Sequence, residues 1–346
     1  MNPAESSEPG EGLFVGIDVG GTNVKIGLID DSGKILGNAA FPTEQEKGPE
    51  FALAKACEMV QGLLVDAGLD YSRVLSFGLG TPGPMDIPAG LILTPANLPG
   101  WRNFPVRETL ARLSQRPVTF ANDAAAAAFG EYWVGSGKAY SSIVLVTLGT
   151  GVGGGIIVDD VSIDGAHSHG AEIGHMVIDS RDDARVCSCG MKGHLEAYAS
   201  ATAVVARTLD RLLEGAASEL TEDLSLTPLM VAKAATNGDE LARQIVMETA
   251  DYLAAGLSSL AHVIDPGAIL IGGAMNFGGS QDALGSEFLE RVRARVRSHT
   301  FPMVAKNLTI EFASLGSGAG FVGAAGLGRR DFLRSHRHSA VASQRS

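Results

Sequence analysis

Short apolar runs separated by turn-forming residues fill the first part of the chain. Leu13–Ile17, Val24–Ile29 and Ile35–Phe41 are bounded by glycine and aspartate, which predicts three consecutive strands. Glu50–Ala67 places apolar residues at helical spacing, and Val74–Gly80 is apolar throughout, as in a buried strand. The chain therefore begins with strands and then alternates them with helices.

The same alternation continues to the end of the chain. The pattern predicts strands at 118–121, 143–148, 156–158, 268–273 and 308–312, and helices at 106–114, 122–132, 195–213, 228–236, 240–264, 288–298 and 316–328. Alternating strands and helices are typical of an α/β protein with mixed sheets.

Composition shifts divide the chain into regions. Residues 1–11 are rich in Pro, Glu, Ser and Gly, which predicts a disordered N-terminal tail without the apolar core of a signal peptide. Gly135–Lys138 is the expected hinge. We therefore expect a smaller α/β lobe at 12–134, with helix 316–330 packing back on it, and a larger lobe at 135–315. Residues 331–346 show no periodicity and are expected to form a flexible tail.

Charge and cysteine content exclude several classes of protein. The chain has 346 residues and a net charge of −12, which argues against a nucleic-acid partner. No apolar run approaches the ~20 residues of a membrane helix, so no membrane partner is expected. Three cysteines give no disulfide framework, and a cytoplasmic location is expected.

Two strand–glycine–strand segments suggest a phosphate site. Phe14–Leu28 and Thr147–Val158 each place glycines beside a threonine between two apolar runs. Bare backbone N–H groups in such a turn suit an anion, although a glycine pair between strands is more often an ordinary hairpin turn. Gly21, Thr22, Asn23, Lys25, Thr150 and Gly151 are the candidate phosphate ligands, and Asp18 could hold Mg²⁺ through water.

A carboxylate at a strand–helix junction could act as a general base. Asp123 follows a strand and starts an alanine-rich helix, and α/β proteins place ligands at such strand ends. Asn122 beside it could bind a polyol. The alternative is that Asp123 only caps the helix.

A group of soft ligands predicts a metal site. His175, Cys187, Cys189 and His194 have the residue types and the local spacing of a closed tetrahedral Zn²⁺ site. The alternative is two free thiols and scattered histidines. His167 and His169 could compete as ligands, but they fit polar loop positions better.

Taken together, these motifs resemble the ROK family of repressors, uncharacterised reading frames and sugar kinases. The matching motifs are Asp-Val-Gly-Gly-Thr-Asn, Pro-Gly-Pro, Asn-Asp-Ala-Ala-Ala-Ala, Gly-Thr-Gly-Val-Gly-Gly-Gly, Glu-Ile-Gly-His and Cys-x-Cys-Gly-x-x-Gly-x-Leu-Glu, spread from about Leu13 to Leu327. The resemblance implies a two-lobed, actin-like ATPase fold of the hexokinase type, related to ribonuclease H. It also implies a homodimer.

The resemblance further implies roles for individual residues. It makes Asp123 the base and assigns the sugar to Gly83, Pro84, Asn97, Asn122, Asp123, Gly151, Glu172, His175 and Glu196. It adds Gly273 to the ATP and Mg²⁺ ligands above, and places a structural Zn²⁺ on His175, Cys187, Cys189 and residue 194. The chain departs from the family at His194, where the family has Cys, and at His167 and His169, where it has a Gly/Asn-rich turn.

The segment Asn97–Trp101 resembles the glucokinase branch of the family. The expected activity is therefore an ATP-dependent hexose kinase that phosphorylates the 6-hydroxyl of glucose. N-acetylmannosamine, N-acetylglucosamine and fructose remain alternative substrates. A non-catalytic sugar sensor is the rival class, while the short polar stretch before Leu13 predicts no DNA-binding domain.

Overall fold

The computed structural model describes residues 12–95, 97–222 and 225–343, with side chains as far as residue 337. The chain divides into two compact units. Over the described residues, the first unit comprises 12–138, 162–170 and 317–343, and the second comprises 139–161 and 171–316. The first boundary follows the glycine-rich segment that was expected to be a hinge.

The first unit is built on a mixed sheet. Over the described residues, its five strands lie in the order β3-β2-β1-β4-β7, with β1–β2 and β2–β3 antiparallel and β1–β4 and β4–β7 parallel. Its elements are β1 (Leu13–Val19), β2 (Asn23–Asp30), β3 (Ile35–Pro42), α1 (Gly48–Ala67), β4 (Val74–Thr81), β5 (Met85–Asp86), β6 (Leu91–Ile92), α2 (Val106–Ser114), β7 (Val118–Asn122), α3 (Asp123–Trp133) and α10 (Ala319–Ser343).

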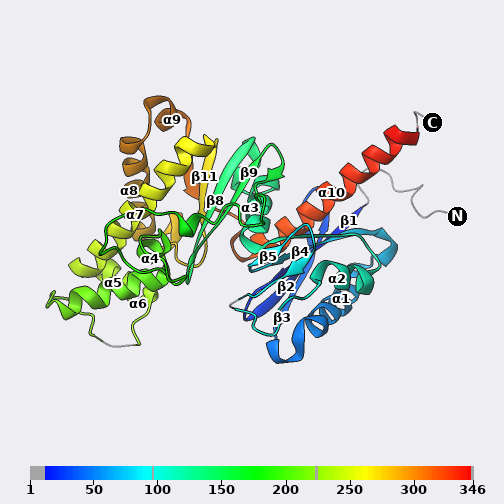
Figure 1. Ribbon diagram of the computed structural model, residues 1–346, viewed down its shortest axis with the longest axis horizontal. Coiled ribbons are helices and arrows are strands. Elements are labelled where there is room, and N and C mark those ends of the chain that lie inside the picture. The colour runs from blue at the N-terminus through cyan, green and yellow to red at the C-terminus, as the bar shows by residue number, and fades with distance from the viewer. Residues whose placement is uncertain (1–11, 96, 223–224, 344–346) are drawn as a thin grey trace. The chain divides into compact units, whose positions relative to one another are not determined.

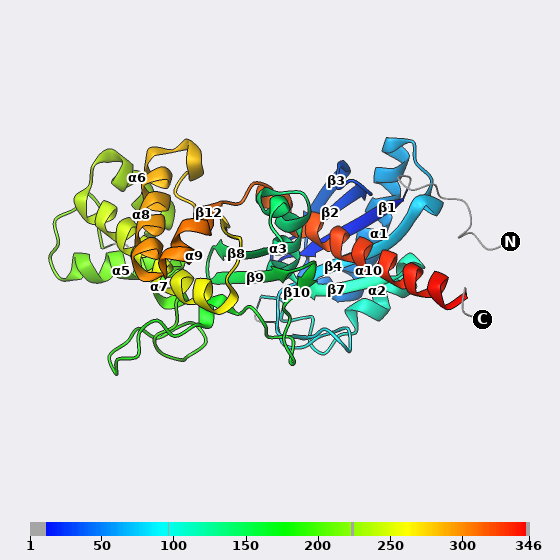
Figure 2. The ribbon, with the colours of Figure 1, turned by 90° about the horizontal axis from the view of Figure 1, so that it is seen from above.

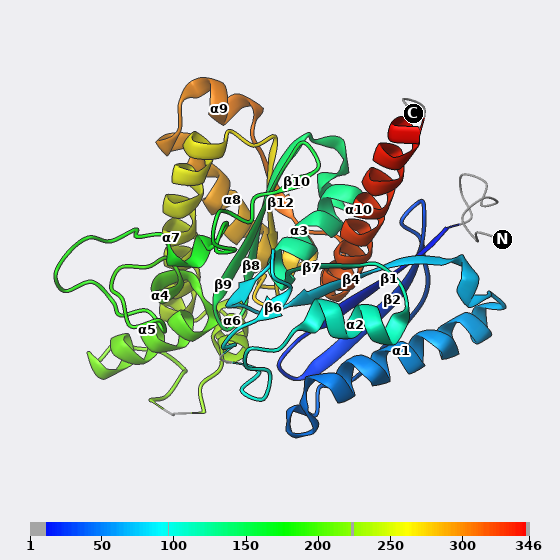
Figure 3. The same cartoon turned by 45° about the vertical axis from the view of Figure 1, so that its right-hand side comes forward.

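Helices cover both faces of this sheet. Figure 3 shows α1 and α2 on one side and α10 on the other. The apolar side chains of α1 and α2 form one core with the strands, and α10 packs on the other face with both side chains and backbone. A Cβ at Gly16 of β1 would meet the carbonyl of Phe321, and one at Gly78 of β4 would meet that of Ala324. The close approach of α10 therefore requires glycine in both strands.

The second unit has a sheet of the same kind with larger helices. Over the described residues, its strands lie in the order β10-β9-β8-β11-β12, with β8–β9 antiparallel and β11 parallel to both β8 and β12. Figures 1 and 2 show α7 and α8 lying side by side. The elements are β8 (Ser142–Leu148), β9 (Val152–Val158), β10 (Val161–Ser162), α4 (Glu196–Ala199), α5 (Ala201–Leu213), α6 (Pro228–Asn237), α7 (Glu240–Ile264), β11 (Ala268–Gly272), α8 (Ala283–His299), α9 (Pro302–Asn307) and β12 (Thr309–Phe312).

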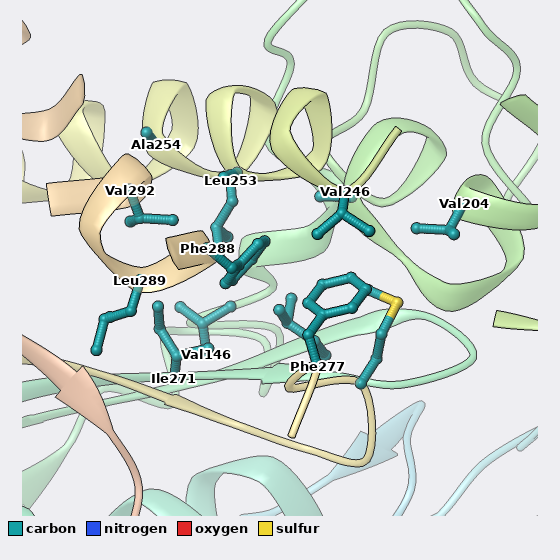
Figure 4. Packing of buried hydrophobic residues seen from close by; sticks show 14 of the residues in the cluster. Val146, Val204, Val246, Leu253, Ala254, Ile271, Phe277, Phe288, Leu289 and Val292 are labelled. Atoms are coloured by element: carbon teal, nitrogen blue, oxygen red, sulfur yellow. The ribbon is translucent and has the colours of Figure 1, made fainter. Parts of the chain in front are cut away.

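The core of the second unit is dense around α7 and α8 (Figure 4). Phe288 on α8 is fully buried, and its ring lies 4.9 Å from that of Phe277, which follows β11. Leu253 of α7 and Ile271 of β11 complete the contact between helices and sheet. This packing holds the ends of β8 and β11, where candidate ligands lie.

Most predicted elements are confirmed, and the exceptions have local causes. The single helix expected at 195–213 is wrong: Ser200 is extended (ψ 166°), and its hydroxyl caps α5 by accepting from the Ala203 N–H. The helix expected at 288–298 begins earlier, at Ala283, because the Asp282 side chain caps it. Helix α9 was not predicted.

The C-terminal region also differs from expectation. Helix α10 does not stop near residue 330 but continues to Ser343, so residues 331–343 are helical rather than a tail. The expected tail at 1–11, Ala96 and residues 344–346 lie outside the described residues. In the described part of the chain, no helix is both long enough and apolar enough to cross a membrane.

Candidate active site

Parallel strands bring the carboxylates of the first unit to one edge of its sheet. In the strand register Asp18 of β1 is paired with Gly80 of β4, and Gly80 with Ala121 of β7. Asn122 and Asp123 follow Ala121 directly, at the carboxyl end of β7. This is the edge at which α/β sheets bind ligands.

Asn122, and not Asp123, caps helix α3. The Asn122 Oδ1 accepts from the backbone N–H of Ala124 at 2.9 Å and of Ala125 at 3.2 Å. Asp123 is the first helical residue, and its Oδ1 accepts from the Ala124 N–H at 2.8 Å. Asn122 is therefore the N-cap residue, and Asp123 accepts one N–H of the first turn beside it.

The first glycine turn is held by residues that the sequence did not single out. The Gly20 N–H donates to the Asn23 carbonyl at 2.9 Å and closes the turn. The buried Thr43 hydroxyl donates to the Gly20 carbonyl at 2.7 Å, and the Gln45 side-chain amide to the Gly21 carbonyl at 2.7 Å. These bonds occupy the carbonyls of Gly20 and Gly21 and hold the turn in place.

Asn97 and the Gly83–Pro84 pair also belong to the first unit. Asn97 lies against the turn, since a Cβ at Gly21 would be 3.2 Å from the Asn97 carbonyl oxygen and 3.3 Å from its Cβ. Gly83 and Pro84 are joined by a cis peptide bond just after β4, and a Cβ at Gly83 would lie 4.0 Å from the Asn122 side-chain nitrogen. The ends of β1, β4 and β7 with the residues that follow them, the start of β2 and the Asn97 loop thus carry the predicted residues of this unit.

Asp18 is held in an electrostatically unfavourable place. Burial and the nearby Asp123 carboxylate raise the pKa of Asp18 to about 6, although Lys25 lowers it. The Lys25 ammonium donates to the Ser317 carbonyl at 3.1 Å. Asp18 and Asp123 repel each other, and a divalent cation between or beside two such carboxylates would relieve that repulsion. The two residues therefore fit Mg²⁺.

The second glycine turn joins β8 to β9 in the second unit. Its Gly149 N–H donates to the Gly151 carbonyl at 3.0 Å, and the Thr202 hydroxyl donates to the Thr150 carbonyl at 2.9 Å. The following Val152 N–H donates to Glu196 Oε2 at 3.0 Å. The turn is therefore fixed by the starts of α4 and α5 (Glu196 and Thr202).

Gly151 lies in close contact with the Glu196 side chain of the protein itself, and not only with a possible ligand. A Cβ there would lie 3.1 Å from Cδ of Glu196 and would collide with Oε2. The other oxygen of Glu196 accepts from the Ser188 hydroxyl at 2.5 Å. Glu196 thus links the glycine turn to the segment that carries the two neighbouring cysteines.

A cavity of about 680 Å³ opens beside the second turn. Gly149 and Thr150 line it together with a mostly apolar set of residues that also includes two amides, a threonine, a lysine and an aspartate: Ala201, Pro228, Leu229, Ala232, Lys233, Thr236, Asn237, Ala274, Met275, Asn276, Phe277, Gly278, Asp282 and Leu284. Gly273 does not line it. Its φ of 93° instead lets the chain press against Leu148, with the Met275 N–H donating to the Leu148 carbonyl at 3.0 Å.

One helical turn carries Glu172 and His175. The His175 N–H donates to the Glu172 carbonyl at 3.0 Å, and Ile173 between them is buried. Gly154 in β9 makes room for Ile173, because a Cβ at Gly154 would lie 2.6 Å from Ile173 Cγ1. Glu172 is exposed as a result, while His175 is half-buried.

The four predicted metal ligands lie together. One ligand atom from each of His175, Cys187, Cys189 and His194 falls within 4.8 Å of the other three. The two Nδ1 atoms are 3.3 Å apart, Cys189 Sγ is 3.3 Å from His194 Nδ1, and Cys187 Sγ is 3.8 Å from His175 Nδ1. Zn–N bonds of about 2.05 Å and Zn–S bonds of about 2.3 Å give tetrahedral edges of about 3.3 to 3.8 Å. The donor set therefore fits Zn²⁺.

His167 and His169 are not part of this group. They lie in 162–170, which belongs to the first unit, and His169 Nδ1 is 2.5 Å from the His167 carbonyl oxygen. Ser168 between them accepts from the Ile87 N–H at 2.9 Å. This agrees with the expectation that both histidines are polar loop groups.

Comparison with known proteins gives consistent matches over most of the chain. The ROK family model matches residues 14–331. A glucokinase of Halalkalibacterium halodurans is 32% identical over 314 residues, covering 90% of this chain and 93% of that protein.

Solved structures agree with these matches. The ROK hexokinase of Thermus thermophilus is similar with a TM-score of 0.80 and 29% identity, covering 93% of this chain and 99% of that one. The ROK family glucokinase of Streptomyces griseus, solved with glucose and AMPPNP, has a TM-score of 0.72 and 32% identity over 92% of this chain and 100% of that one.

Proposed function

The chain belongs to the ROK family and has its actin-like ATPase fold, and from this premise we propose how it acts as an ATP-dependent kinase of glucose. The chain is a hexose kinase. One structural observation carries the residue-level proposal. Asn122 caps α3, which places the Asp123 carboxylate at the ligand-binding edge of the sheet without requiring it for the cap. A carboxylate at that place suits a general base.

In the proposed reaction Asp123 accepts the proton of the glucose 6-hydroxyl. As the proton leaves, O6 forms a bond to the γ-phosphorus of ATP, and the bond from that phosphorus to the β,γ-bridging oxygen breaks, which releases ADP. Transfer of this kind needs little covalent help beyond positioning and charge. Asn122 donates or accepts at a neighbouring hydroxyl, which orients the sugar toward the base.

The second unit supplies the other proposed sugar ligands. Glu172 and His175 project from one turn, and Glu196 follows the cysteine segment. Because the His175 nitrogen that faces the other ligands is Nδ1, its Nε2 remains as a polar contact for a hydroxyl. Gly83, Pro84 and Asn97 of the first unit, and Gly151 of the second, complete the proposed sugar set.

We place the nucleotide in the cavity that begins at Gly149 and Thr150. The Thr150 backbone in the glycine turn suits phosphates, and the mostly apolar walls of the cavity suit a base. In the first unit Gly21, Thr22, Asn23 and Lys25 are the proposed phosphate ligands, and Asp18 holds Mg²⁺ through water. When bound, the metal offsets phosphate charge. Gly273 directly precedes Ala274 of this cavity and is a further proposed nucleotide ligand.

We propose a structural zinc site of two cysteines and two histidines. Its support is the match between the spacing of the four ligand atoms and a Zn²⁺ tetrahedron. All four positions are protein ligands, so the metal stabilises the loop and leaves no site for substrate. Thiolate ligands suit a reducing compartment, and we place the enzyme in the cytoplasm. A homodimer is proposed from the family alone.

The experiment that tests this function is an ADP-release assay with ATP across a hexose panel. We expect glucose to give the highest kcat/KM, because Asn97–Trp101 resembles the glucokinase branch. A preference for N-acetylmannosamine, N-acetylglucosamine or fructose would overturn the substrate and leave the kinase intact. Sugar binding without any ADP release would instead favour a sensor.

A further inference from the structure

The start of helix α10 lies against the Asp18 carboxylate. A Cβ built at Gly320 would be 2.5 Å from Asp18 Cγ and 3.1 Å from Oδ1, and would collide with Oδ2. Gly320 is buried, so no solvent gap separates the two. The residue that touches the proposed Mg²⁺ ligand therefore comes from the far end of the chain, and it has no side chain.

Helix α10 cannot retreat from this contact, because its next turn is fixed on two sides. A Cβ at Gly323 would lie 2.6 Å from the Ala126 carbonyl carbon and 2.6 Å from the Gly130 nitrogen, both in α3. On the other side the Phe321 carbonyl presses on Gly16 of β1. The same stretch of α10 thus touches the helix that begins with Asp123 and the strand that ends beside Asp18.

The turn before α10 is also tied to this site. The Lys25 ammonium donates to the Ser317 carbonyl at 3.1 Å, and Lys25 is the cation that lowers the pKa of Asp18. The first N–H groups of a helix carry partial positive charge, which favours a nearby carboxylate. Contact and charge therefore both fix the position of the Asp18 side chain.

We propose that Gly320 is a positioning residue for phosphoryl transfer: its lack of a side chain lets α10 set the place of the Asp18 carboxylate. This rests on the proposed function in so far as Asp18 serves Mg²⁺. A methyl group at Gly320 would force the carboxylate to move by about 1 Å to restore an ordinary contact of about 3.5 Å. A displacement of that size at a reacting centre costs on the order of 10²-fold in rate.

The test compares Gly320→Ala with Gly326→Ala, a matched substitution on the same helix. A Cβ at Gly326 would lie 2.6 Å from the Trp133 ring and 2.9 Å from the Phe129 ring, away from Asp18. We expect both variants to melt at a lower temperature than wild type. Only Gly320→Ala should lower kcat, by about 10- to 100-fold. It should also raise the Mg²⁺ concentration needed for half-maximal rate, with the glucose KM nearly unchanged.

A double-mutant cycle, measured by melting temperature, tests the contact between Gly320 and Asp18 without relying on catalysis. Asp18→Ala removes the carboxylate that the new methyl group meets, so adding Gly320→Ala should then cost little further stability. Gly326→Ala should cost the same in both backgrounds. If Gly320→Ala alone does not fold, the double variant should fold.

Three results would overturn the proposal. The first is a kcat and a Mg²⁺ requirement of Gly320→Ala that equal those of wild type. The second is an equal loss of kcat in Gly320→Ala and Gly326→Ala. The third is a loss of melting temperature from Gly320→Ala that is the same with and without Asp18→Ala, or a double variant that does not fold. An inactive wild type would overturn the proposed function instead, and the melting cycle would still report on the contact.

Discussion

The substitution Asp123→Asn tests the proposed role of Asp123 as general base while leaving its other contacts in place. Asparagine keeps the shape of the side chain and an oxygen that can accept from the Ala124 N–H, as Asp123 Oδ1 does at 2.8 Å. The helix cap on Asn122 is untouched. What is lost is the proton acceptor and one negative charge.

The expected loss of turnover is large and the expected change in stability small. Removing a general base costs about 10²- to 10⁴-fold in kcat, or about 2.7 to 5.5 kcal/mol of transition-state stabilisation. Loss of a charge at a helix N-terminus costs about 0.3 to 1 kcal/mol. Relief of the repulsion between Asp123 and Asp18 offsets part of that cost. We therefore expect the melting temperature to change by less than about 3 °C.

The assay is coupled ADP release at saturating glucose and ATP, with glucose binding measured by calorimetry. The matched control is Asp239→Asn, which makes the same chemical change at the cap of α7, where Asp239 accepts from the Ala242 N–H at 2.8 Å. The control should keep normal turnover. If Asp123→Asn retains turnover within about threefold of wild type while folded, Asp123 is not the base.

The remaining predictions concern the second unit. Gly151→Val should abolish activity in a folded protein, because the new side chain displaces the Glu196 carboxylate, and full activity would refute this account of the turn. Cys187→Ala should lose bound zinc and raise the glucose KM more than the ATP KM, whereas His194→Cys should keep one zinc per chain. Metal analysis with both kinetic constants checks this pair, and a zinc-free wild type with normal activity would contradict it.

The pattern of residues alone predicted those parts of the fold that are determined by neighbouring residues in the sequence. The strand pairs around both glycine turns and the strand–helix junction at Asn122 are confirmed, because apolar runs and capping residues are local signals. The single helix over Ser200 was wrong for a related reason. A serine inside a helical pattern can equally cap a new helix, and only the packing of α4 and α5 decides which.

The pattern of apolar and polar residues could not predict contacts between segments that are far apart in the sequence. Thr43 and Gln45 hold the first glycine turn, yet neither lies near it in sequence or belongs to a motif. Glu196 was expected only as a sugar ligand, but it also bonds Val152 and Ser188. Spacing did bring out the cysteine and histidine group, because residue types that are rare in the chain recur there within a short distance.

The division of the chain has a consequence for synthesis on the ribosome. The chain passes from one unit to the other at 138/139, 161/162, 170/171 and 316/317, so neither unit is a continuous segment. The sheet face that Gly16 and Gly78 open for α10 stays uncovered until that helix has left the exit tunnel. The second unit, whose last residue is 316, can finish first. The strands of the unit that carries Asp123 are made before the second unit, but this unit is complete only after α10 has been made. A nascent chain therefore acquires its proposed base in final form only after the second unit has been synthesised.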